Sequence, residues 1–178
     1  MNKLIETIDL TKVYGEKETS VIALNSITTA FNENQFTAIM GPSGSGKSTL
    51  LHCLAGLDKV TSGSILINGI DLASLNDKEL TKMRRDSFGF VFQAFNLIPT
   101  LTAEENITLP SSIAGRKPED EWVEQVINAM DIGDRLGHRP NELSGGQQQR
   151  VAAARAMASK PEVIFADEPS GNLDSKAS

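Results

Sequence analysis

The N-terminal part of the chain carries apolar residues in patterns typical of β-strands. Apolar positions alternate loosely over residues 4–10, β-branched residues are frequent over residues 21–31, and residues 64–67 form a short apolar run. The last run is followed by Asn68-Gly69, a pair that favours a tight hairpin turn. Residues 36–40 are apolar without alternation, which predicts a buried strand. The front of the chain is therefore predicted to be rich in strands.

Further along, the pattern changes to helical spacing. A capping residue followed three positions later by Glu or Gln marks a helix start at Asn76, Thr102 and Ser144. The helix after Thr102 is expected to end near Pro110, because proline interrupts the hydrogen bonds of a helix. Another helix is expected from Pro118, with apolar residues on one face: Trp122, Val123, Val126, Ile127 and Met130.

Two short apolar runs, residues 88–92 and 162–166, predict buried strands. The segment from 94 to 140 lies between them and is predicted to be a helical insertion. Residues 1–93 and 141–178 then form the rest of a single α/β domain. With 178 residues, the chain is long enough for one domain with a sizeable core.

Composition narrows the possible partners. The formal net charge of -6 argues against nucleic acid as the main partner, because such proteins usually present a basic surface. No stretch has the length of uncharged apolar sequence needed to span a bilayer, and Glu6 and Asp9 interrupt any signal-peptide pattern. Cys53 is the only cysteine, so no internal disulfide is possible, which suits a reducing compartment.

The most informative stretch is residues 41–49, here called the phosphate loop. It matches the pattern G-x-x-x-x-G-K-[ST] between a predicted strand and a helix expected over 48–57. Backbone N–H groups of such a loop surround phosphate, and glycines let the backbone approach closely. Lys47 is expected to reach the β- and γ-phosphates, and the Ser48 hydroxyl to bind Mg²⁺. The predicted phosphate-binding residues are Gly41, Pro42, Ser43, Gly44, Ser45, Gly46, Lys47, Ser48 and Thr49.

Two other stretches carry candidate chemistry. Asp167 and Glu168 follow a predicted core strand, where open α/β sheets bind ligands. Asp167 can hold Mg²⁺, and Glu168 can orient or deprotonate a water that attacks a γ-phosphate. Ser144, with the glycines after it, begins a helix and offers a second anion site, although the same residues also suit an ordinary capped helix.

Together these stretches resemble the ATP-binding cassette family over nearly the whole chain. Their order is Tyr14, the phosphate loop, Gln93 after a strand, Leu-Ser-Gly-Gly-Gln at 143–147 (the signature segment), and the acidic strand end at 163–168. Residues 92–101, His138-Arg-Pro140 and 167–174 are similar to the lipoprotein-release and macrolide-export branch. The resemblance implies a P-loop NTPase fold with a RecA-like core sheet, an N-terminal antiparallel β subdomain and an inserted α-helical subdomain.

The resemblance also implies residue roles and the cofactors ATP and Mg²⁺. Tyr14 would stack on adenine, Gln93 would contact Mg²⁺ and water, and Glu168 would be the catalytic base. The signature residues Ser144, Gly145, Gly146 and Gln147 would serve the nucleotide on the opposite subunit. Two copies would then form a homodimer with ATP at its interface, with Asp174 also at that interface.

The partner that the resemblance implies is an integral membrane permease. The apolar loop, residues 95–101, would transmit dimer closure to it, unless that loop simply faces the core. The chain would act at the cytoplasmic face of the cell membrane. ATP binding would close the dimer and hydrolysis would reopen it.

One feature of the family is not found in this sequence. Its switch histidine follows the Asp174 loop by some tens of residues, whereas the sequence ends at Ser178 and both histidines, His52 and His138, lie upstream. We therefore expect a fragment or a shortened protein without the final strands of the sheet. Two alternatives to an export ATPase are a soluble family member acting on ribosomes or DNA, and a regulatory ATP-binding module with little turnover.

Overall fold

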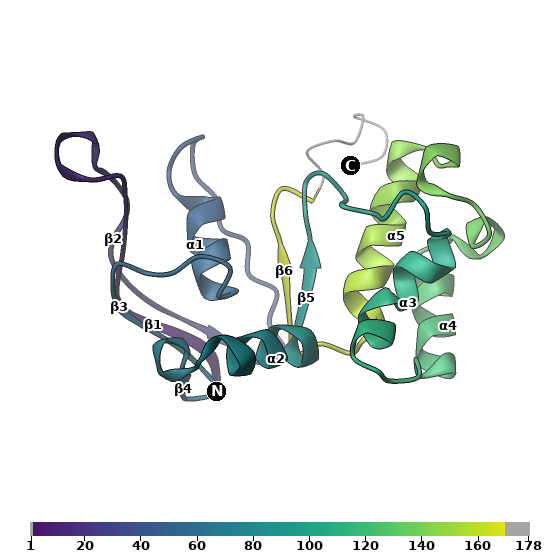
Figure 1. The fold of residues 1–178 in the computed structure, drawn as a ribbon, viewed down its shortest axis with the longest axis horizontal. Helices are drawn as coiled ribbons and strands as arrows, with labels where there is room; N and C mark the ends of the chain where they lie inside the picture. Colours follow the sequence, from purple (N-terminus) through teal and green to yellow (C-terminus); the bar gives the residue numbers. More distant parts are fainter. Residues whose placement is uncertain (1, 170–178) are drawn as a thin grey trace. The chain divides into compact units, whose positions relative to one another are not determined.

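The computed structural model describes residues 2–169 and divides into two compact units, Met1–Lys82 and Met83–Ser178. Figure 1 shows the elements of each unit along the chain. The segment 171–174, which contains the Asp174 of the expected dimer interface, lies outside the described residues.

The first unit is built on a four-stranded antiparallel sheet in the order β2-β1-β3-β4. Its strands are β1 (Lys3–Tyr14), β2 (Val21–Asn32), β3 (Ser62–Ile67) and β4 (Ile70–Asp71). The expected hairpin at Asn68-Gly69 is confirmed, since Ile67 pairs directly with Ile70. The apolar side chains that face the interior are less than a tenth exposed: Ile5, Leu10, Leu24, Ile65 and Ile67. The predicted strand-rich front of the chain is therefore confirmed.

Helix α1 (Lys47–Leu54) follows the phosphate loop. It buries Cys53 and Leu54 in the first unit. The helix was expected to reach residue 57, but it ends at Leu54 because Gly56 takes the left-handed conformation, with φ of 63°, that commonly terminates helices.

The predicted strand over residues 36–40 does not form. Among the described residues this run pairs with no other strand, and Phe36 and Met40 are 97% and 87% exposed. A strand exists only where a neighbouring strand takes up its backbone hydrogen bonds. An apolar run alone therefore did not determine the structure of this segment.

In the second unit, β5 (Phe88–Val91) pairs in parallel with β6 (Val163–Ala166). Both strands were expected, but the expectation that β6 is buried was wrong for Ile164, which is 45% exposed. The reason is that β6 pairs on one side only within the described residues. Gly89 of β5 lies directly against helix α5, where an added Cβ would come within 2.3 Å of the Ala156 carbonyl oxygen.

Three helices form the core of the second unit: α3 (Ala103–Ile113), α4 (Asp120–Ala129) and α5 (Gly145–Ala158). They lie side by side in Figure 1 and share a cluster of buried residues. Its members include Ile107, Val123, Val126, Ile127, Ile132 and Val151. Helix α5 contributes Val151, Ala154 and Ala158 to this core and packs against both α3 and α4. That residues 94–140 form a subdomain inserted into the rest of the domain stays a prediction.

Two expectations about helix boundaries are tested by these helices. The capping boxes at Thr102 and Ser144 are confirmed by reciprocal side-chain bonds. The expected end of α3 near Pro110 was wrong, because the helix continues to Ile113 with Pro110 inside it. Ile107 and Ser111 are buried on both sides of the proline, and this packing offsets the lost backbone hydrogen bond.

The remaining helical segments are shorter or lie at the division between the units. Helix α2 (Asp77–Ser87) begins with Asn76, whose side chain accepts the N–H groups of Lys78 and Glu79, as the cap pattern predicted. The single-turn helices are η1 (Lys17–Thr19), η2 (Leu72–Ser74), η3 (Gly133–Arg135) and η4 (Pro140–Glu142). Among residues 2–169, no helix is both long and apolar enough to cross a membrane.

Candidate functional site

The phosphate loop lies on the surface of the first unit, with residues 41–45 exposed. The Lys47 ammonium folds back over the loop and donates to the carbonyl oxygens of Gly41 and Pro42, each at 3.0 Å. These bonds are to exposed neutral acceptors, which phosphate oxygens with their negative charge would readily replace. The loop thus presents a cation and a set of backbone groups to the solvent at one place.

Glycine is required at Gly46, the residue that begins helix α1. Its φ is 89°, and an added Cβ would lie 2.5 Å from the carbonyl oxygen of Ala23 in β2. Gly44 also has a positive φ of 76°, but nothing lies within 4 Å of its Cβ position. Backbone conformation therefore favours glycine at both positions, and close packing requires it only at Gly46.

Tyr14 lies close to the phosphate loop in the same unit. Its hydroxyl donates to Asp58 at 2.5 Å and also interacts with the side chain of Thr49. Lys12 donates to the other carboxylate oxygen of Asp58 at 2.6 Å, and its ammonium lies 4.6 Å from the centre of the Tyr14 ring. The ring is 41% exposed. Tyr14 is therefore held next to the loop by a charged network, with part of its surface open to solvent.

The charges of this network shift one another's pKa values. Hydrogen bonds from Lys12 and Tyr14 hold the pKa of Asp58 below its usual value. In turn, the hydrogen bond that each donates to Asp58 raises the pKa of Lys12 and the pKa of Tyr14. Lys12 and Asp58 were not among the predicted site residues. The signal that could have found Lys12 is its spacing from Tyr14, since residues two apart in a strand share a face.

The second unit brings together Gln93, Asp167 and Glu168 at one edge of its parallel sheet. Val91 pairs with Ala166 at the ends of β5 and β6, and the Asp167 N–H donates to the Val91 carbonyl at 3.0 Å. The residues that follow each strand therefore emerge at the same carboxyl edge, as predicted. Glu168 is exposed and has a left-handed φ of 45°, which turns the chain sharply after the strand.

These residues suit a magnesium ion in chemical type. In the second unit, the Asp167 carboxylate and the Gln93 amide oxygen are oxygen ligands, which Mg²⁺ prefers. The Ser48 hydroxyl of the first unit is a ligand of the same chemical type. Within the described part of the chain, no three His, Cys, Asp or Glu side chains cluster closely enough to hold a metal by themselves. A magnesium ion would accordingly need further oxygens, such as those of a phosphate.

The signature segment forms the start of helix α5. The Ser144 hydroxyl accepts the Gln147 N–H at 3.3 Å, and the Ser144 N–H donates to the Gln147 side-chain oxygen at 2.9 Å. Ser144 and Gly145 are exposed. The first-turn N–H groups of Gly145 and Gly146 have no acceptor within the helix. The segment can therefore be a capped helix start and still offer N–H groups to an anion, because the cap does not use those of Gly145 and Gly146.

Two further residues with polar contacts in the second unit were missed. Arg155 donates from α5 to the carbonyl oxygens of Asn96 and Phe95, at 2.6 and 2.8 Å. Asn106, which is fully buried in α3, bonds to the backbone of Ile98 and Leu101. The signal for Arg155 was its position between Val151 and Ala158, on the buried face of an otherwise alanine-rich helix.

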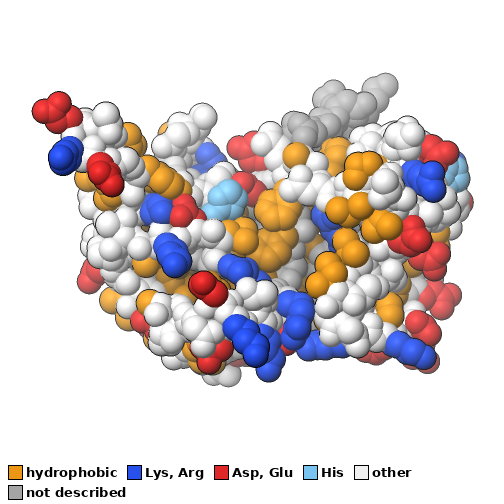
Figure 2. Space-filling model, viewed as in Figure 1, with side chains coloured by type: hydrophobic (Ala, Val, Ile, Leu, Met, Phe, Trp, Pro, Cys, Tyr) orange, Lys and Arg blue, Asp and Glu red, His pale blue; other side chains and the backbone are white. Residues whose placement is uncertain are grey.

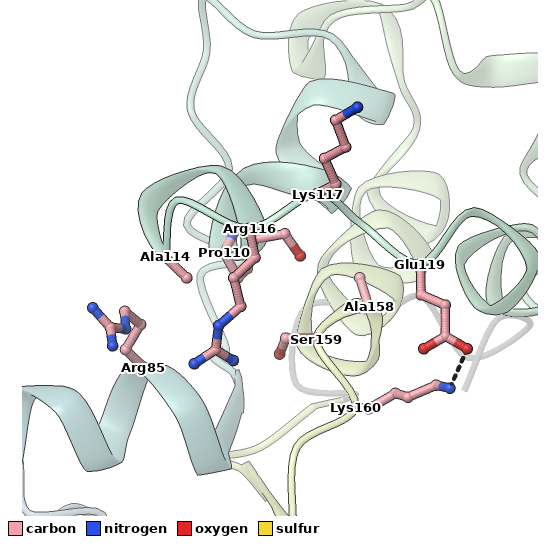
Figure 3. A pocket seen from close by; sticks show the side chains of 10 residues that line it. Arg85, Pro110, Ala114, Arg116, Lys117, Glu119, Ala158, Ser159 and Lys160 are labelled. Carbon is pink, nitrogen blue, oxygen red and sulfur yellow. Dashed lines mark hydrogen bonds and ion pairs between the residues drawn. The ribbon is translucent and has the colours of Figure 1, made fainter.

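A small hollow of about 160 Å³ lies among α2, α3, α4 and α5 and contains none of the predicted site residues. Figure 3 shows the guanidinium groups of Arg85 and Arg116 near each other and the ion pair between Lys160 and Glu119. Arg85 and Arg116 both bond to Asp86 at 2.8 Å. Three of the four cations that line the hollow, Arg85, Arg116 and Lys160, are already paired with carboxylates, so beyond Lys117 the hollow has little free positive charge to offer a phosphate.

Comparison with known proteins gives a family and specific relatives. A family described as "ABC transporter" matches residues 24–171. The chain is 49% identical to the macrolide export ATP-binding/permease protein MacB of Marinobacter nauticus, over 98% of this chain and 28% of that protein. It is 47% identical to the lipoprotein-releasing system ATP-binding protein LolD of Geobacter metallireducens, over 100% of this chain and 80% of that protein.

A solved structure is also similar to the model of this chain. It is a dimeric ATP-binding cassette in a post-hydrolysis state bound to ADP and Pi, with a TM-score of 0.86 and 45% sequence identity. The similarity covers 97% of this chain and 77% of that one. The two chains are thus similar in sequence as well as in fold.

Proposed function

The chain belongs to the ABC transporter family as an ATP-binding domain of the P-loop NTPase fold, and from this premise we propose that it is the ATP-hydrolysing subunit of a membrane export complex. It would work by closing a dimer around ATP. The observation that carries the proposal is the phosphate loop, where Lys47 lies over an exposed glycine-rich backbone at the start of α1. The relatives MacB and LolD, by their names, belong to export and release systems.

Nucleotide binding is assigned to the first unit. Residues 41–49 would hold the phosphates, with the Lys47 ammonium exchanging its two carbonyl acceptors for phosphate oxygens. Adenine would stack on Tyr14, on the ring surface that Lys12 leaves open. The network of Asp58 and Lys12 would keep that ring beside Thr49.

Hydrolysis is assigned to the strand ends of the second unit. Ser48, Gln93 and Asp167 would hold Mg²⁺, which when bound neutralises negative charge on the phosphates. Glu168 would orient the attacking water and accept its proton, a role for which its carboxylate is exposed. Gln93 would hold the same water through its amide.

The signature segment would act on the nucleotide of a second copy. The N–H groups of Gly145 and Gly146 and the Ser144 hydroxyl would bind the γ-phosphate of that nucleotide. Closure is favoured only while the γ-phosphate is present, because only the closed dimer makes these contacts, and hydrolysis then allows reopening. The dimeric state of the similar cassette bound to ADP and Pi supports this arrangement.

The apolar loop would meet the membrane partner at the cytoplasmic face of the membrane. Figure 2 shows hydrophobic side chains gathered over the segment that connects β5 and α3. Within it Ile98 is 41% exposed. An integral permease subunit would supply the complementary surface; MacB, by its name, is an ATP-binding and permease protein in one chain.

The test is phosphate release from ATP by the parent chain, Glu168→Gln and the control Glu124→Gln, an exposed acid on α4. We expect Glu168→Gln to lower the rate by about 10²–10⁴-fold, because it removes the general base, while ATP binding is retained. Glu124→Gln should match the parent. If the parent binds ATP and dimerises but releases no phosphate with or without a permease, the export-ATPase proposal fails and a regulatory ATP-binding module is favoured.

A further inference from the structure

Arg155 is a charged side chain in a position that normally holds an apolar one. It lies on α5 between Val151 and Ala158, both buried, and is itself half-buried. Among the described residues it forms no ion pair with a carboxylate, and burial lowers the pKa of its guanidinium. A half-buried cation without a counter-charge is costly unless hydrogen bonds to the protein replace its lost hydration.

The groups that Arg155 holds are two consecutive backbone carbonyls. Nη1 donates to Asn96 at 2.6 Å and Nη2 donates to Phe95 at 2.8 Å. Both residues have left-handed backbones, with φ of 49° and 55°, which side-chain-bearing residues rarely adopt. The planar guanidinium suits two acceptors at once, whereas a lysine ammonium would not reach both with the same geometry. Arg155 therefore stabilises a strained turn shortly after Gln93.

The other end of the apolar loop is held by Asn106 of α3. This fully buried side chain accepts the Ile98 N–H at 2.7 Å and donates to the carbonyls of Ile98 and Leu101, each at 3.2 Å. The loop is thus fixed through its backbone at both ends; Leu97 packs against the core of the second unit, while Ile98 is 41% exposed. Asn106 and Arg155 lie on helices that pack directly against each other.

Helix α5 also carries the signature segment at its first turn, about three turns before Arg155. We propose that Arg155 is a positioning residue that ties the apolar loop to the signature helix, so that movement of α5 on nucleotide-driven closure moves the loop that meets the membrane partner. The proposal rests on the proposed function. A bidentate side-chain link to a strained backbone is a stiff connection, and it needs no contact with the nucleotide itself.

The experiment is hydrogen exchange of backbone amides, with and without a non-hydrolysable ATP analogue and Mg²⁺. It compares the parent, Arg155→Lys and the control Arg116→Lys, an exposed arginine given the same substitution. Without nucleotide, we expect amides of residues 95–101 to exchange about tenfold faster in Arg155→Lys, while α5 keeps its protection. With the analogue, exchange at the start of α5 should change in all three chains, and exchange in the loop should change in the parent and Arg116→Lys only.

Two other outcomes overturn the proposal, and a variant that does not fold is replaced. If the loop of Arg155→Lys responds to the analogue as the parent does, Arg155 is only structural. If Arg155→Lys fails to fold, Arg155→Gln, which keeps one amide donor, takes its place and must show the same loss of response. If the parent does not bind the analogue, measured separately by nucleotide fluorescence, the proposed function fails and the link with closure fails with it.

Discussion

Two helices of this protein begin with glycine-rich segments, yet their first turns are built in opposite ways. Helix α1 begins at Gly46, whose left-handed backbone provides no side-chain cap. Helix α5 begins at Ser144, where a complete capping box joins Ser144 and Gln147. Both starts were predicted to bind phosphate oxygens. The first is shaped by the backbone of the loop before it, and the second is stabilised by its own side chains.

The difference teaches how each site would meet its ligand. At α1 the loop, Lys47 and Tyr14 lie in one unit and are placed before nucleotide arrives. At α5 the cap joins Ser144 and Gln147 and does not use the N–H groups of Gly145 and Gly146. The proposed γ-phosphate contact would therefore add bonds to a helix start that is already stabilised by its own cap.

The largest effect is expected at the start of α1. Gly46→Ala should lower the free energy of unfolding by about 2–3 kcal/mol, because φ of 89° strains any side chain and the new Cβ would meet the Ala23 carbonyl. Gly44→Ala, which has the strain without the clash, should lose about 1 kcal/mol. Denaturant unfolding measures both. Equal losses in the two variants would show that packing against β2 does not matter.

A smaller effect is expected in the network that holds Tyr14. Asp58→Asn should cost about 1–2 kcal/mol at pH 7, since it weakens charge-assisted bonds from Lys12 and Tyr14. The pKa of Asp58 is lower in the folded chain than its ordinary 3.8, so its contribution is present above about pH 4 and is lost as pH falls through the folded pKa.

The free energies of unfolding of the parent and Asp58→Asn should therefore differ at pH 7 and converge as the pH falls through the folded pKa of Asp58. Asp134→Asn serves as the control, because Asp134 is 71% exposed and, within residues 2–169, forms an ion pair with its neighbour Arg135 alone. It should change stability by less than about 0.5 kcal/mol at either end of this range. A constant difference between the parent and Asp58→Asn across this range would mean that the carboxylate charge is not what stabilises the network.

The smallest effect on stability is expected at the start of α5. This test separates the capping role of Ser144 from its proposed role in binding phosphate. Ser144→Ala should cost about 1 kcal/mol through the lost cap, and Thr102→Ala, which removes the equivalent cap of α3, should cost the same. Only Ser144→Ala should also weaken ATP-dependent dimerisation, measured by analytical ultracentrifugation. If both variants dimerise like the parent, the signature serine is a helix cap and nothing more.

The sequence predicted those parts of the structure that depend on neighbours within a few residues. The caps at Asn76, Thr102 and Ser144 were all found, since each joins residues two or three positions apart. For the first sheet, the sequence predicted that strands form but did not predict their order. Register shifts in β1 near Asp9 depend on Gly63 of β3, whose Cβ position lies 2.4 Å from the Asp9 carbonyl. No local pattern encodes that contact.

For the candidate site, the sequence by itself determined which residues are proposed to carry chemistry: the phosphate loop, the acidic strand end and the signature segment. Their identity follows from residue type and spacing, because phosphate binding needs glycine backbone, a cation and a helix start in a fixed order. Tertiary structure alone decided what supports them. Asp58 reaches Tyr14 across 44 residues and Arg155 reaches Phe95 across 60. Such contacts form only when the chain has folded, because the packing of distant elements, and not the spacing along the chain, brings their atoms together.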